Sequence, residues 1–254
     1  MVGVAFCAAG SHRPKSSNLA NPLALNSTGF SLETITDEQS FVKKETVFLI
    51  HGLWMNGLEL FPLARSLRRA GYDVRFFRYP TRHSLARSAQ RLHAQISQLE
   101  PGTVHLIGHS LGGLLLCYLT ALGGLPERGR VLMLGTPLAG SHAARALGRW
   151  RLGQWRLGRW MMGEETFRAL LGERPRWPDC LPLGVIAGER RAGLGALVAH
   201  GLPAPHDGTV SVAETRTQEV TRHLIVRHSH FGMLWARDVH AQALHYLATG
   251  SFIN

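Results

Sequence analysis

The stretch Gly108-His109-Ser110-Leu111-Gly112-Gly113 lies between an apolar run at Val104–Ile107 and an apolar helical segment expected over Leu114–Leu122. A serine hydroxyl is a poor nucleophile unless it is held clear of the backbone, where a base can reach it. A sharp strand-to-helix turn does this, and glycines two residues on either side remove side chains that would clash. This setting predicts a nucleophile at Ser110.

Short apolar runs alternate with helix-like stretches from Thr46 onward, which is the pattern of a parallel sheet with crossover helices. We therefore expect an α/β fold, in which a mostly parallel central sheet is flanked by helices. The expected strands are Thr46–Ile50, Asp73–Arg78, Val104–Ile107, Arg130–Leu134, Leu183–Ala187 and His223–Arg227. The expected helices are Leu60–Ala70, Leu85–Leu99, Leu114–Leu122 and Val239–Ala248.

The length of 254 residues fits one such domain with an insertion. Residues 1–44 are rich in Ser, Asn, Pro and Gly and are expected to be an extended or poorly ordered N-terminal segment, so that residues 45–254 form the domain. A segment at about 141–182 interrupts the rhythm with a near-repeat that ends in Trp150, Trp155 and Trp160. A period of five does not line one face of a helix, so we expect a cap-like insertion.

A tetrahedral oxyanion needs two backbone N–H donors aimed at one point. One is expected from Leu111, the residue after the nucleophile. The other is expected from Leu53, in the loop His51-Gly52-Leu53-Trp54 after the first strand, where Gly52 lets the backbone turn inward. An ordinary glycine turn is the alternative interpretation of this loop.

The expected general base is His230, which follows the last strand and precedes a helix-like stretch. His228 is the alternative, although it could still belong to the strand. The expected orienting acid is Asp207, on a loop between the fifth strand and this histidine, which gives the chain order Ser, Asp, His. The alternatives are a plain Asp-Gly turn at this loop, or one of the acids Glu189, Asp179 and Asp238.

Together these motifs resemble the α/β-hydrolase superfamily and, within it, the lipase and esterase branch. The resemblance covers roughly residues 45–250 and implies a serine hydrolase that cleaves carboxylic esters through an acyl-enzyme, with Ser110, His230 and Asp207 as the triad. The matching stretches, in chain order, are His-Gly at 51–52, Gly-His-Ser-Leu-Gly-Gly at 108–113, Leu-Gly-Thr-Pro-Leu-Ala-Gly-Ser at 134–141, Asp-Gly-Thr-Val at 207–210 and His-Phe-Gly-Met-Leu at 230–234.

The sequence also departs from that branch. The Trp-rich insertion matches no familiar lid, the oxyanion loop has no run of glycines, and no calcium loop is evident. A serine at 110 argues against dehalogenases, which use aspartate there. An acyltransferase, a thioesterase or an amidase would use the same triad, and a non-catalytic binding protein could retain the fold, although it would not need all three residues. No metal or organic cofactor is implied.

The formal net charge of +11 is compatible with nucleic acid, an anionic membrane surface or an acidic substrate, and equally with a compositional habit of the source genome. No basic run alternates with aromatic residues as in nucleic-acid modules, so we expect no nucleic-acid partner. The expected substrate is a small-molecule or lipid ester. The Trp- and Arg-rich insertion could touch a membrane surface weakly, or it could pack on its own core.

The three cysteines show neither metal spacing nor a disulfide framework, and Cys117 is expected to be a buried small hydrophobe. The apolar stretch Met1–Gly10 lacks a positive start and a clear cleavage site, and no apolar run is long enough to span a membrane. We therefore expect a soluble, cytoplasmic protein, with export left open by that N-terminus.

Overall fold

The computed structural model describes residues 44–126, 128–149, 162–192 and 201–254. Its centre is a six-stranded sheet in the order β2-β1-β3-β4-β5-β6, and every neighbouring pair is parallel. The expected α/β fold is confirmed, and each strand lies within two residues of its predicted bounds. The strands are β1 (Thr46–Ile50), β2 (Asp73–Phe77), β3 (Val104–His109), β4 (Val131–Leu134), β5 (Leu183–Gly188) and β6 (Arg222–Val226).

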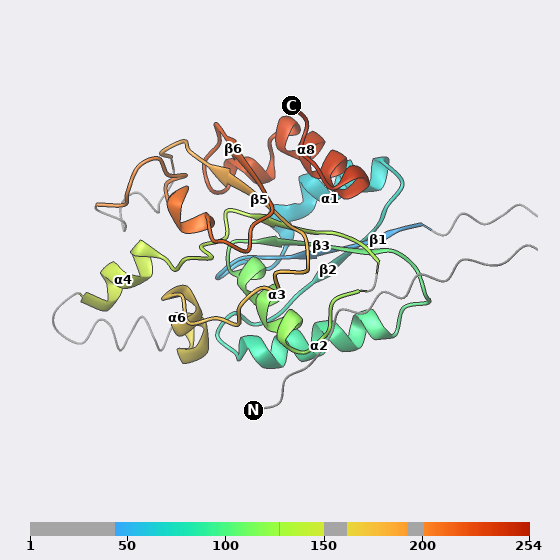
Figure 1. The fold of residues 1–254 in the computed structure, drawn as a ribbon, viewed down its shortest axis with the longest axis horizontal. Coiled ribbons are helices and arrows are strands. Elements are labelled where there is room, and N and C mark those ends of the chain that lie inside the picture. The colour runs from blue at the N-terminus through green and yellow to red at the C-terminus, as the bar shows by residue number, and fades with distance from the viewer. Residues whose placement is uncertain (1–43, 127, 150–161, 193–200) are drawn as a thin grey trace, which may run out of the picture. The chain divides into compact units, whose positions relative to one another are not determined.

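Helices cover both faces of the sheet (Figure 1). Helices α1 (Phe61–Arg69) and α8 (Arg237–Thr249) pack on one face, and α2 (Leu85–Ser97) and α3 (Leu111–Ala121) pack on the other. Strand β1 shows why both faces need to be covered, because successive side chains of a strand point to opposite faces and those of β1 are apolar on both. Val47 and Leu49 join the core under α1 and α8, whereas Phe48 and Ile50 join the core under α2 and α3. A strand that is apolar on both faces is typical of such a central position.

The helix after Ser110 begins earlier than the sequence predicts, at Leu111 and not at Leu114. Its first turn contains Gly112 and Gly113, and because glycine has a low helix propensity the sequence pattern placed the start of the helix after them. Tertiary packing overrides this propensity. A Cβ on Gly112 would lie 2.3 Å from the carbonyl oxygen of Ile50, so the first turn of α3 packs backbone to backbone on the end of β1.

The predicted insertion contains two described helices, α4 (His142–Arg149) and α6 (Glu164–Leu170), and neither was predicted. Phe167, Ala169 and Leu170 of α6 belong to the same core cluster as α3. The three tryptophans of the near-repeat lie outside the described residues, as does the N-terminal segment up to residue 43. The cap role of this insertion therefore stays a prediction.

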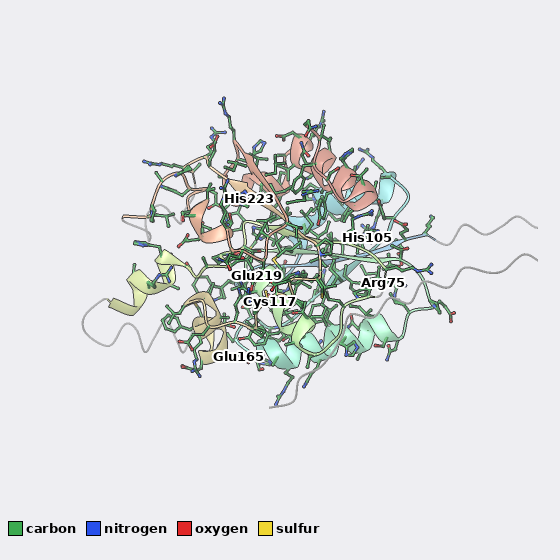
Figure 2. All side chains as sticks on the ribbon, viewed as in Figure 1. Arg75, His105, Cys117, Glu165, Glu219 and His223 are labelled. Atoms are coloured by element: carbon green, nitrogen blue, oxygen red, sulfur yellow. The ribbon has the colours of Figure 1, made fainter. Side chains whose placement is uncertain are left out.

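A buried ion pair ties the chain after α6 to the segment before β6. Arg174 Nη2 lies 2.5 Å from Glu219 Oε2, and each side chain is only 6% exposed. Burial alone would raise the pKa of Glu219, but the hydrogen bond and charge of Arg174 outweigh it and lower this pKa. The guanidinium also lies 3.8 Å from the Sγ of Cys117 on α3, and both Cys117 and Glu219 are labelled in Figure 2. Cys117 is fully buried, as expected, and burial raises the pKa of its thiol to about 12.

None of the helices in the described ranges combines the length and the hydrophobicity that a membrane span requires.

Removing one partner of the buried pair should destabilise the fold strongly, because the other charge is then left buried and unpaired. We expect Glu219→Ala to lower the free energy of unfolding by about 3–5 kcal/mol, measured by urea denaturation. The matched control is Glu173→Ala, which removes the exposed partner of Arg168. Solvent screens that pair, so the control should unfold at the same urea concentration as the wild-type protein. Equal losses in the two variants would contradict a role of the buried pair.

Candidate active site

Ser110 occupies a strained turn between β3 and α3. Its φ of 51° and ψ of −118° lie outside the regions that non-glycine residues favour. The turn is held from outside, because the Ser110 N–H donates to the carbonyl oxygen of Leu134 at the end of β4, at 2.8 Å. Thr136 Oγ1 donates to the Ser110 carbonyl at 3.1 Å. Such strain persists only where the surrounding structure enforces it, and it is characteristic of functional positions.

His230 and Asp207 form a buried pair on the loops after β6 and β5. The distance from His230 Nδ1 to Asp207 Oδ2 is 2.7 Å, and the side chains are 4% and 1% exposed. The His230 backbone N–H also donates to the Asp207 carbonyl, at 2.9 Å. Because the carboxylate accepts, the proton of a neutral imidazole lies on Nδ1, and Nε2 keeps its lone pair. This is the tautomer that a general base requires.

The loop that carries Asp207 is fixed by its own hydrogen bonds. Asp207 Oδ1 accepts the backbone N–H groups of Thr209 and Val210, at 2.8 and 2.7 Å. The buried carboxylate of Glu214 accepts the N–H of Ser211 at 2.6 Å and that of His142, the first residue of α4. The acid loop is therefore joined to the start of the predicted insertion.

The end of β4 brings the serine and the His–Asp pair to one place. Leu134 accepts the Ser110 N–H, and the next residue, Gly135, lies against the pair. A Cβ on Gly135 would lie 3.0 Å from His230 Nδ1 and 3.3 Å from Asp207 Oδ2, and its φ is +57°. Only glycine fits such a position without displacing its neighbours. Ser110 and the His230–Asp207 pair therefore both lie against the end of β4, at the carboxyl edge of the sheet.

His109, which precedes the serine, touches the His230 loop directly. Its Nε2 lies 3.2 Å from the His230 carbonyl oxygen, and the two ring centroids are 4.7 Å apart. Since a carbonyl oxygen can only accept, Nε2 of His109 carries the proton. Burial is the main cause that lowers the pKa of His109 well below its ordinary value, and the neighbouring charge of His230 is the second. Its Nδ1 is buried without a hydrogen-bond partner in the described part of the chain.

The alternatives weighed from the sequence are engaged elsewhere. His228 pairs with Asp238 at 2.8 Å, on the outer side of the loop. Glu189 lies 3.6 Å from Arg227, and Asp179 lies 3.4 Å from Arg176. Among the described acids that were considered, only Asp207 reaches His230.

The two amides expected to stabilise an oxyanion flank the serine. Leu111 follows Ser110 directly, and a Cβ on Gly52 would lie 3.3 Å from the Ser110 Cβ, so the loop carrying Leu53 passes beside the serine. Within the described ranges, neither the Leu53 N–H nor the Leu111 N–H donates to an acceptor. A pair of unused donors beside the serine has the chemistry of an anion-stabilising site.

The imidazole of His51 holds the peptide that carries the Leu53 N–H, a contact that sequence reasoning missed. His51 Nδ1 donates to the Gly52 carbonyl at 2.9 Å, and Nε2 accepts the N–H of Tyr79 at 3.3 Å. The Tyr79 hydroxyl donates to the His51 carbonyl at 3.0 Å, and the two rings stack at 4.5 Å. Both partners fix the neutral tautomer, and burial lowers the pKa of His51 accordingly. The available signal was the position of Tyr79 just after β2, at the same sheet edge.

Comparisons with known proteins support the fold. The family described as the alpha/beta hydrolase family matches residues 47–250. The mature lipase BlEst2 of Bacillus licheniformis has a similar structure, with a TM-score of 0.59 and 18% identity over 81% of this chain and 91% of the lipase. A metagenomic carboxyl esterase has a TM-score of 0.53 and 17% identity over 74% of this chain and 65% of its own. A bromoperoxidase of Bacillus anthracis has a TM-score of 0.52 and 14% identity over 81% and 92%.

Identities this low establish the shared fold and do not establish the reaction. The comparison with curated proteins found no match. Within the described ranges, no three His, Cys, Asp or Glu side chains are grouped so that they could hold a metal ion.

A side chain at position 135 should separate His230 from Asp207. We expect Gly135→Ala to weaken their hydrogen bond, seen as loss or shift of the downfield Nδ1–H resonance of His230 in proton NMR. The matched control is Gly123→Ala, because Gly123 has a similar φ of +66° but no atom within 4 Å of its Cβ position. Both variants carry the backbone strain of a left-handed alanine, but only the first should change that resonance. An unchanged resonance in Gly135→Ala would refute the proximity.

Proposed function

The chain belongs to the alpha/beta hydrolase family, and from this premise we propose that it is a serine hydrolase that cleaves carboxylic esters. The observation that carries the proposal is that the buried His230–Asp207 pair, with a hydrogen bond of 2.7 Å, and Ser110, in a strained strand-to-helix turn, both lie against the end of β4. A buried carboxylate that orients an imidazole next to a serine has one well-understood chemical use, the activation of the hydroxyl as a nucleophile. The names of two structural neighbours, a lipase and a carboxyl esterase, favour esters as the substrate class.

In the first half of the proposed reaction, Ser110 Oγ attacks the ester carbonyl while His230 Nε2 takes its proton. Asp207 accepts the Nδ1–H of the imidazole and stabilises the imidazolium that forms. The tetrahedral intermediate carries a negative charge on the former carbonyl oxygen, and the Leu53 and Leu111 N–H groups receive it. The imidazolium then protonates the leaving alcohol, and an acyl-enzyme remains on Ser110.

In the second half, water replaces the alcohol. His230 takes a proton from the water, which attacks the acyl-enzyme, and the same two amides stabilise the second oxyanion. The collapse of this intermediate releases the acid and returns the proton to Ser110. The position of Ser110 as N-cap residue of α3 adds to this stabilisation, because a helix N-terminus carries a partial positive charge.

The first test is covalent labelling with a fluorophosphonate, which phosphonylates activated serines. We expect the purified protein to be labelled at Ser110, identified by peptide mass spectrometry, and Ser110→Ala to be unlabelled. His230→Ala and Asp207→Asn should label far more slowly, and their esterase kcat on p-nitrophenyl esters should fall by about 10⁴-fold.

His228→Ala is the matched control, because His228 lies two residues from the proposed base but pairs with Asp238. It should be labelled at nearly the wild-type rate. A folded wild-type protein that is not labelled, or is labelled at another serine, would refute the proposal. Quantifying the released acid against any transferred acyl product separates a hydrolase from an acyltransferase on the same triad.

A second test concerns His51, which we expect to act as a positioning residue. His51→Phe keeps the ring that stacks on Tyr79 but removes the donor to the Gly52 carbonyl. His51→Asn loses the ring but can keep a donor near the Nδ1 position. We expect His51→Phe to lower kcat by about 10- to 100-fold with little change in KM, since a misaligned oxyanion donor acts on the transition state. His51→Asn should lose less. The reverse order would show that ring packing, and not the hydrogen bond, matters.

A further inference from the structure

Trp54 combines backbone strain with solvent exposure. Its φ is +58°, and within the described ranges the only other non-glycine residue with a positive φ is Ser110. Bulky residues rarely adopt this conformation. Its side chain is nevertheless 59% exposed, so it contributes little to the core. The fold therefore holds a large, mostly exposed aromatic side chain in an unfavourable backbone conformation.

The indole forms one wall of a cleft of about 560 Å³. The volume is within the range of small-molecule sites. Two segments line it: Trp54 and Met55 form one side, and the segment from Tyr79 to His83 forms the other. Most of this lining is apolar or aromatic. Tyr79 is itself buried and stacked on His51, so the lining of the cleft borders the oxyanion loop.

Both sides of the cleft are anchored. The Trp54 N–H donates across it to Thr81 Oγ1 at 3.3 Å. Behind the far side, Thr166 Oγ1 of α6 donates to the Thr81 carbonyl at 3.0 Å. Glu165, labelled in Figure 2, accepts the Ala86 N–H at the start of α2, at 3.1 Å. Hydrogen bonds from α6 thus fix the segment opposite Trp54, which makes the cleft a preformed feature.

The cleft begins close to the proposed nucleophile. A Cβ on Gly52 would lie 3.3 Å from the Ser110 Cβ. Two residues of chain span at most about 7 Å, so the Trp54 Cα lies within about 12 Å of the Ser110 Cβ, which is the length of an extended acyl chain of medium size. A group bonded to the ester carbonyl at Ser110 can therefore reach the indole while its oxygen lies at the Leu53 amide.

We propose that this cleft binds an apolar group of the ester substrate, an aromatic ring or an alkyl chain, with Trp54 as the residue that sets this preference. The inference rests on the proposed esterase function and deepens it by naming the substrate class. The indole provides a flat apolar surface at low cost in side-chain entropy, and a bound apolar group would remove this surface from water. The strain at Trp54 is then the consequence of directing the ring into the cleft.

The experiment compares kcat/KM for p-nitrophenyl esters from acetate to octanoate, and for acetates of alcohols from methyl to benzyl. Trp54→Gly removes the ring and the strain, and Trp54→Ala removes the ring alone. For the largest members of one series we expect both variants to lose about tenfold or more of kcat/KM relative to the smallest member of that same series. Trp54→Phe should retain most of the preference. The series that responds identifies whether the acyl or the alcohol group enters the cleft.

Trp235→Ala is the matched control. Trp235 is also exposed, at 65%, but it does not line the cleft, and its Nε1 donates to the Glu59 carbonyl at 3.2 Å. It should change neither series. Trp54→Gly should melt at the wild-type temperature or above it, because glycine relieves the strain.

Fluorophosphonate labelling separates the two possible failures. If the wild type is not labelled at Ser110, the proposed function fails. The other failure appears when wild type and Trp54→Gly are labelled equally. If Trp54→Gly then loses activity on all esters by the same factor, or on none of them, the cleft does not select the substrate and the inference is overturned.

Discussion

The close approach of three backbone segments at the start of α3 is the constraint on which the site depends. Gly112 lies against the Ile50 carbonyl at the end of β1, and the Ser110 N–H donates to Leu134 at the end of β4. These contacts fix the ends of three neighbouring strands relative to one helix terminus. Ser110 cannot relax into a common backbone conformation without breaking these contacts. The packing of the sheet against its helices therefore maintains the strain at Ser110.

The remaining parts of the site come from loops, and side-chain hydrogen bonds give these loops their precision. Glu214 links the acid loop to α4, His109 contacts the carbonyl of His230, and His51 holds the Gly52 carbonyl. Each of these side chains is buried and binds backbone groups. The geometry of the residues proposed to react is therefore set by a surrounding layer of side chains, as precise positioning generally requires.

The sheet was predictable because strands such as β1 and β5 are continuous apolar runs bounded by turn residues. Site residues were predictable where a reactive side chain lies in a motif that also specifies the local backbone, as Ser110 does between a strand and a helix. The strand order and the unpredicted helix α6 depend on packing between distant segments, and local propensity misplaced the start of α3. The contact of His51 with Tyr79 joins residues 28 positions apart, and the position of Tyr79 after β2 places it at the same sheet edge without specifying its partner. The three tryptophans of the near-repeat lie outside the described residues, so the predicted cap role of the insertion is untested.

The buried imidazoles have a consequence for the response of this protein to acid. Burial is the main cause that lowers the pKa of His51, His105 and His109 below the ordinary value of 6.5. As the pH falls below about 6.5, the unfolded chain binds protons on these rings while the folded chain does not. Unfolding then takes up protons, so the folding free energy declines over the window from 6.5 down to the lowered values. Acid would thus weaken the scaffold that surrounds the serine, and a loss of activity in that range would include loss of the fold.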